Sequence, residues 1–147
     1  MSLKEIRQAA IDRLEALFPL KSEFINVFDA ENNPGNILGN GFNCIWGEGT
    51  PITGNTKRIA LESILIVSLT KTVETRVNDN IAPLIDDLFV DIETVIKDFF
   101  NQTNLGITES WMRGFKRVNV AAPRLIAGNK FALINIYFVV DHTIDLI

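Results

Sequence analysis

Residues 77–100, VNDNIAPLIDDLFVDIETVIKDFF, contain the pattern that most restricts how this chain can fold. Their apolar side chains recur at spacings of three and four, which places them on one face of an α-helix. These side chains are Ile81, Leu84, Ile85, Leu88, Ile92, Val95, Ile96 and Phe99. Asn80 suits the N-cap, and Pro83 then falls in the first turn, where its missing N–H costs little. The pattern predicts a helix over residues 81–100, about 30 Å long.

A second helix is predicted at the start of the sequence, over residues 2–18. Ser2 and Glu5 have the spacing of a capping box, in which each side chain satisfies a backbone N–H of the first turn. Pro19 ends the helix, because proline cannot continue the backbone hydrogen bonding. The apolar stripe of this helix consists of Leu3, Ile6, Ala10, Leu14 and Leu17.

The other apolar segments are typical of strands. Residues 23–29 and 42–47 are rich in aromatic and β-branched side chains. Residues 58–75 predict a long strand that is apolar on both faces near its middle, as expected of a central strand covered on both sides. Residues 107–120 and 130–142 predict two more strands, joined by a turn near AAPRLIAGN.

The last predicted strand, over residues 130–142, is apolar on both faces. One face carries Ala132, Ile134, Ile136, Phe138 and Val140, and the other carries Phe131, Leu133, Tyr137 and Val139. This strand is therefore either central or covered by a neighbouring subunit. The element order of helix, strands, helix, strands predicts a single α+β domain over residues 1–147, with two helices packed on a mainly antiparallel sheet.

The composition restricts the function more than it identifies it. Hydrophobic residues make up 47% of the 147 residues, and the mean hydropathy is +0.18. Because apolar side chains in excess of one core tend to lie between subunits, we expect a homo-oligomer. The net charge of −4, with no basic run, argues against specific DNA binding. No signal peptide or membrane span is apparent, so we expect a protein made in a reducing cytoplasm.

Six of the nine glycines lie within residues 35–54, in GNILGNGFN and GEGTPITGN. A Walker loop needs a lysine, and no lysine lies between Lys21 and Lys57. The spacing also does not match a dinucleotide-binding loop. The pattern instead indicates loops between strands, where glycine and asparagine adopt positive φ angles.

Residues 30–57 are therefore predicted to form one or two extended loops, including residues 47–55, around a short strand. Loops of this length are uncommon in compact domains unless they are functional or disordered. Two interpretations remain open. The segment is either a contact arm that becomes ordered against a partner or a long hairpin folded on its own domain.

Catalytic, metal and cofactor sites are not predicted. Cys44 lies in an apolar run and is interpreted as a core side chain. His142 follows Asp141 in a strand, where neighbours point to opposite faces, so the two do not form a dyad. The acidic side chains of the second helix are expected on a solvated face, where their pKa values would not be shifted. They are Asp79, Asp86, Asp87, Asp91, Glu93 and Asp98.

Residues 111–120, WMRGFKRVNV, alternate aromatic and basic side chains. Such a pattern can bind single-stranded nucleic acid by stacking and charge. Three cations are few for that purpose, and arginine is also enriched in protein interfaces. A solvated or subunit-facing strand edge is the favoured interpretation.

The element order as a whole resembles a known family. A short capped helix is followed by a glycine-rich hairpin, then by the long strand RIALESILIVSLTKTVET leading directly into NDNIAPLIDDLFVDIETVIKDFF, and ALINIYFVV forms the final strand. This order and these sizes resemble the tail terminator, or tail completion, proteins of long-tailed bacteriophages. Neck, tail-tube and head-completion proteins of the same assembly would meet the same description.

The resemblance implies a non-enzymatic virion protein that forms a hexameric ring at the head-proximal end of the tail. Such a ring caps the tail tube, stops its polymerisation and binds the neck or head-completion protein, and DNA passes through it. Sheet edges near residues 58–75 and 107–120 would then be candidates for contacts between subunits. The residues expected to contact partners are Asn33, Asn36, Ile37, Leu38, Asn40, Trp46, Glu48, Ile52, Arg58, Trp111, Arg113 and Arg117.

Two other functions remain open from the sequence. One is a small α+β enzyme or ligand-binding domain with a pocket between helix and sheet. The other is a bacterial adaptor that binds a single protein partner through the 30–57 segment.

Overall fold

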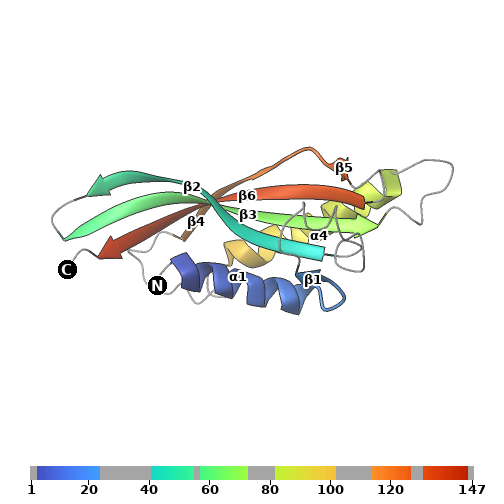
Figure 1. Cartoon of the computed structure of the whole chain (residues 1–147), viewed down its shortest axis with the longest axis horizontal. Coiled ribbons are helices and arrows are strands. Elements are labelled where there is room, and N and C mark those ends of the chain that lie inside the picture. Colours follow the sequence, from blue (N-terminus) through green and yellow to red (C-terminus); the bar gives the residue numbers. More distant parts are fainter. Residues whose placement is uncertain are drawn as a thin grey trace.

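A computed structural model describes residues 3–23, 41–54, 57–72, 82–101, 114–126 and 131–145. The elements are α1 (Leu3–Leu17), β1 (Ser22–Glu23), β2 (Gly41–Gly54), β3 (Arg58–Thr72), α4 (Ala82–Phe100), β4 (Gly114–Val120), β5 (Arg124–Ile126) and β6 (Phe131–Asp145). Both helices lie on one face of the sheet, in a two-layer arrangement (Figure 1). The predicted α+β class is confirmed.

The sheet has six strands, with β1, β2, β3, β6 and β4 in that order and β5 paired to the other end of β6. All pairings are antiparallel except the short parallel pairing of β1 with β2. β3 pairs with β2 over residues 59–69 and with β6 over residues 58–72, so the expectation of a free sheet edge is wrong for residues 59–69, and residues 73–75 lie outside the described part of the chain. Strand order depends on long-range pairing, which the local pattern does not encode.

The core lies between the helices and the face of the sheet that is turned toward them, which we call the inner face. The strands contribute alternate residues to it: Phe42, Cys44, Leu65, Val67, Leu69, Ala132, Ile134, Ile136, Phe138 and Val140. The helices contribute Ile6, Ala10, Ile11, Leu14, Leu84, Leu88, Ile92, Val95 and Phe99. The ring centroids of Phe99 and Phe138 lie 5.0 Å apart. The predicted apolar face of the last strand and the predicted stripe of the second helix therefore meet.

Both helices form where the sequence predicts them. Pro19 follows the end of α1, and the Phe18 N–H still donates to the Leu14 carbonyl at 2.9 Å. The predicted caps at Ser2 and Asn80, and the stripe residue Ile81, lie outside the described residues.

The expectation that the acidic side chains of α4 are all solvated is wrong for Asp98. Arg13 of α1 donates two hydrogen bonds to the Asp98 carboxylate, from Nε at 3.0 Å and from Nη2 at 2.5 Å. The Asp98 side chain is only 8% exposed. This carboxylate raises the pKa of Arg13, chiefly by hydrogen bonding. The pair joins the two helices, because Arg13 lies in α1 and Asp98 lies in α4. The sequence pattern missed it because the two residues are far apart in the chain.

The predicted loop over residues 47–55 is also wrong, because β2 continues to Gly54. Its pairing with β3 is irregular between Trp46 and Gly49 and again between Pro51 and Thr53, and such bulges accommodate glycine and proline within a strand. A Cβ added at Gly49 would lie 3.1 Å from the Ser63 hydroxyl oxygen. Glycine here reflects a close approach between paired strands rather than a turn.

Other predicted boundaries change less. The strand predicted at residues 23–29 is described only at Ser22–Glu23, and residues 24–40 lie outside the described part of the chain. The segment AAPRLIAGN, predicted as a turn, contains the short strand β5, which pairs with the start of β6. The described β2–β3 pairing supports the long-hairpin interpretation for residues 41–54.

The sheet is longer than the helices that cover it. β3 and β6 have 15 residues each and would span about 50 Å, whereas the 19 residues of α4 span about 28 Å. α1 begins beside Trp46, whose indole N–H donates to the Leu3 carbonyl at 3.2 Å, and α4 ends beside Phe138. Residues 47–54, 58–62 and 141–145 therefore extend past both helices (Figure 1) and form what we call the overhang.

Candidate interaction surfaces

The face of the sheet turned away from the helices, the outer face, has a partly exposed apolar centre beside the polar side chains Asn43, Ser68 and Asn135. Its central side chains are Ile45, Ile64, Ile66, Tyr137 and Val139. Ile45 is 45% exposed and the other four are half-buried. No described helix packs on these side chains. The sequence predicted that β3 is covered on both sides. Among the described elements, helices cover only its inner face.

A hollow of about 370 Å³ lies on the outer face near β4. Its lining includes Ile64, Tyr137 and Val139 together with Arg117 and Asn119 of β4. Sheet register explains this grouping, since Arg117 is opposite Val139 and Asn119 is opposite Tyr137. The hollow is thus an apolar depression with one cation and one amide at its rim.

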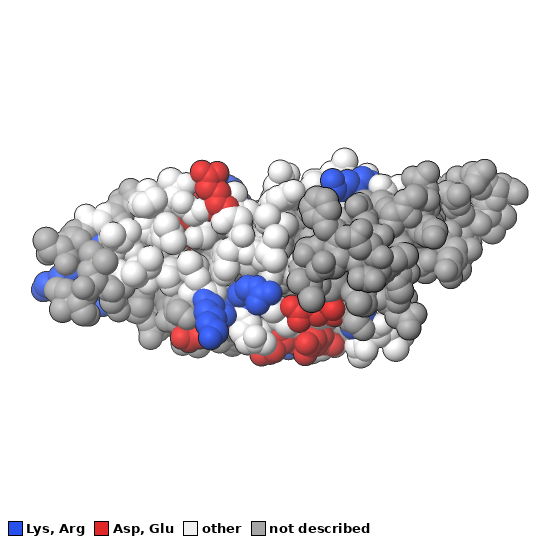
Figure 2. All heavy atoms as spheres, viewed as in Figure 1, with Lys and Arg blue, Asp and Glu red and all other residues white. Residues whose placement is uncertain are grey.

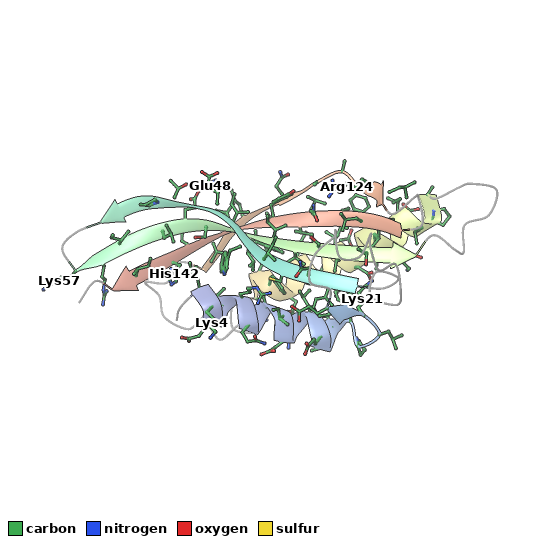
Figure 3. The ribbon with its side chains drawn as sticks, viewed as in Figure 1. Lys4, Lys21, Glu48, Lys57, Arg124 and His142 are labelled. Carbon is green, nitrogen blue, oxygen red and sulfur yellow. The ribbon has the colours of Figure 1, made fainter. Side chains whose placement is uncertain are left out.

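The ion pair between Arg117 and Glu62 on the outer face is exposed to solvent. Arg117 donates to a Glu62 carboxylate oxygen at 3.4 Å, with the Arg117 side chain 65% exposed. Exposed pairs of this kind contribute roughly 0–1 kcal/mol, so Arg117 can exchange this carboxylate for one on a partner at little cost. Arg124 lies opposite Leu133 on the same face and points away from α1 (Figure 3).

α4 carries a second set of exposed apolar side chains, on the side away from the core. Phe89 is 41% exposed and Val90 is 61% exposed. Asp86, Glu93 and Lys97 are exposed on the same side of the helix, at spacings of three and four that align them with the apolar residues. We call these five residues the α4 stripe.

A third feature is a hollow of about 380 Å³ where the end of α1 meets β3 and α4. The Lys21 side chain, 8% exposed, lies beside it with Nζ donating to the Thr70 carbonyl at 3.0 Å and 3.8 Å from the Asp91 carboxylate. Burial lowers the pKa of Lys21, and the negative charge of Asp91 opposes that change. Asp91, like Asp98, is therefore paired rather than fully solvated. The arrangement ties the segment that follows α1 to β3 and α4 around one ammonium group.

Three other chemically notable residues, Cys44, Asp141 and His142, are buried. Burial raises the pKa of the Cys44 thiol to about 12, so it remains a protonated core side chain, as predicted. Asp141 and His142 are both buried and alternate between the outer and inner faces. Within the described ranges, no three His, Cys, Asp or Glu residues are grouped so that they could hold a metal ion. None of the helices in those ranges is both long and apolar enough to cross a bilayer.

The residues predicted to contact partners lie in different parts of the molecule. Trp46 is half-buried against the core, Glu48 and Arg58 are exposed on the overhang, and Arg117 lies at the outer-face hollow. Ile52 lies in β2. The other predicted contacts fall outside the described residues: Asn33, Asn36, Ile37, Leu38, Asn40, Trp111 and Arg113.

The surface above β2 is mostly uncharged, whereas charged side chains gather along α1 (Figure 2).

Sequence reasoning missed Phe89 and Val90 because the main stripe of α4 accounts for the helix without them. The signal was present, since two adjacent apolar residues interrupt an otherwise acidic side of the helix. It also missed Lys21, because its partners at Thr70 and Asp91 are far away in the sequence.

No protein-family model matches this chain, and no curated protein shows significant sequence similarity to it.

Proposed function

We propose that this chain is a ring-forming structural subunit of a phage tail, a tail terminator that caps the tail tube and joins it to the neck. The observation that carries this proposal is the centre of the outer face of the sheet, where apolar side chains are partly exposed, in a fold of the class that the resemblance implies. A monomer gains nothing from leaving such a face in water, whereas an oligomer buries it.

The size and position of this face suit assembly. Stable interfaces bury about 800 Å² on each partner, and a sheet with strands of about 50 Å offers a surface of that order. In a ring, each subunit contacts one neighbour through one patch and the other neighbour through a different patch, because the contacts are head-to-tail. The outer face and the α4 stripe are two such patches.

The electrostatics are compatible with a passage for DNA. The net charge is −4, and a negative field opposes adhesion of the nucleic acid that passes through. The tail tube protein would bind one side of the ring and the neck or head-completion protein the other, at the head-proximal end of the virion tail.

The test is the native mass of the purified protein, measured by light scattering and followed by negative-stain imaging. We expect a ring near six times 16.5 kDa, either alone or on added tail tubes. Tube elongation should also stop when the protein is added to polymerising tube subunits. A monomer that neither binds tubes nor limits their length would overturn the proposal.

The hollow beside Lys21 favours a second candidate function, a domain that binds a small ligand between helix and sheet. This candidate predicts a monomer or dimer whose melting temperature rises with a ligand found by a small-molecule screen. The rise should disappear in Lys21→Met and persist in Lys4→Met, a change on the exposed start of α1. A screen without such a ligand, together with a six-fold ring, would eliminate it.

A further inference from the structure

We propose that the α4 stripe of one copy of this chain docks on the outer sheet face of a second copy, with Phe89 in the hollow beside Tyr137 and Val139. The inference rests on the proposed function only in requiring self-association. It identifies the two patches that meet.

The hollow has room for the side chains assigned to it. Its volume is about 370 Å³, whereas an engineered cavity of about 150 Å³ is enough to bind benzene. Phe89 and Val90 are adjacent and both exposed, so they can enter together. Docking would remove the most exposed apolar groups of α4 from water at the same time as the apolar centre of the outer face.

The charges favour contact between an α4 stripe and an outer face over contact between two identical patches. The α4 stripe carries two carboxylates, Asp86 and Glu93, and one ammonium group, Lys97. The outer face carries Arg117 and Arg124 together with Glu62 and Asp141. Pairing two α4 stripes would bring together two patches in which negative charge predominates, and pairing two outer faces would bring together two patches whose charges nearly balance. Head-to-tail pairing joins opposite charges instead, and charge complementarity of this kind determines which surfaces associate.

The order of the charges agrees as well as their sign. Glu93 and Lys97 are one helical turn apart, a rise of about 6 Å. On the outer face, Arg117 is level with Val139 and Glu62 with Asp141, two residues further along β6, which corresponds to about 7 Å.

Placing Glu93 on Arg117 therefore brings Lys97 level with Glu62 along the strands, with β6 between the strands that carry Arg117 and Glu62. The same placement sets Phe89, one turn earlier in the helix, level with Tyr137 and the hollow. One alignment thus places Glu93 on Arg117 and Phe89 at the hollow.

Charge reversal tests the pairing. Glu93→Arg and Arg117→Glu should each weaken self-association by about tenfold or more, measured by sedimentation velocity at low salt, because each places like charges in contact. The double variant should recover most of the loss. Glu15→Arg, on the exposed side of α1, is the matched control and should leave association unchanged. Equal association in all four variants would overturn the inference.

Cross-linking tests the same contact when association is weak. Glu93→Cys mixed with Arg117→Cys should form a disulfide-linked pair under mild oxidation, faster than either variant alone. Glu15→Cys mixed with Arg117→Cys is the control, and the native Cys44 is buried in both. A yield no higher than the control would contradict the proposed contact.

The two proposals can fail separately. A six-fold ring that survives both charge reversals would keep the proposed function and reject this contact. A cross-linked pair in a protein that never binds tail tubes would keep this contact and reject the function.

Discussion

The two faces of the central strand β3 have similar side chains and different surroundings. Leu65, Val67 and Leu69 point to the inner face and are fully buried by α1 and α4. Ile64 and Ile66 alternate with them, point to the outer face and remain half-buried. The difference shows that this strand has more apolar side chains than α1 and α4 bury. One face stabilises the subunit, and the other is available to stabilise an assembly.

Substitutions at two neighbouring residues of β3 should differ most in their effect on the free energy of unfolding. Leu65→Ala should lower the free energy of unfolding by roughly 2–5 kcal/mol, because it leaves a cavity in the core. Ile64→Ala should cost about 1 kcal/mol, because its side chain is already half in water. Denaturant unfolding at a low protein concentration measures both. Similar costs would show that the outer face is as well packed as the inner one.

The second effect concerns the ion pair that holds α1 to α4 over the inner face. Asp98→Asn should lower the free energy of unfolding by roughly 1–2 kcal/mol, because it removes the charge of a shielded carboxylate while Arg13 can still reach water. Asp86→Asn, exposed on the α4 stripe, is the control and should change stability by less than about 0.5 kcal/mol. If both cost the same, the two sides of α4 do not differ as described.

The third effect is smaller and depends on pH. The pKa of Lys21 is lowered in the folded state by burial, so the unfolded chain binds more protons there between that value and 10.5, the unperturbed pKa. Stability therefore rises with pH across this window, relative to a variant without the group. We expect the free energy of unfolding of the native chain, minus that of Lys21→Met, to increase from pH 8 to pH 10. A constant or falling difference would mean that the ammonium is better solvated than its burial suggests.

The periodicity of apolar side chains in the sequence was enough to predict α4 and the inner face of β6. The spacing of Leu88, Ile92 and Val95 defined α4, and the alternation through Ile136 and Phe138 defined the inner face of β6. The course of β2 beyond Gly47 was missed, because glycine and proline indicate loops locally whereas pairing with β3 tolerates them at bulges.

Of the surfaces, the sequence predicted Arg117 as a candidate contact but not its neighbours in space. Arg117, Ile64 and Tyr137 come from three strands, and only the strand order brings them together. The same applies to Arg13 and Asp98, which are 85 residues apart. A single sequence contains no local signal for such pairs.

The smallest expected effect on the fold is the most informative about the outer face. Arg117→Gln removes a pair with Glu62 that is exposed, so unfolding of the monomer should change by less than about 1 kcal/mol. If Arg117 meets a carboxylate of a second copy, self-association should weaken and become less sensitive to salt, because one of the screened attractions is gone. Sedimentation at two salt concentrations measures this, with Arg58→Gln on the overhang as the control. An unchanged salt dependence would mean that assembly, like folding, does not use this charge, and the contrast between the two faces would then rest on their apolar side chains alone.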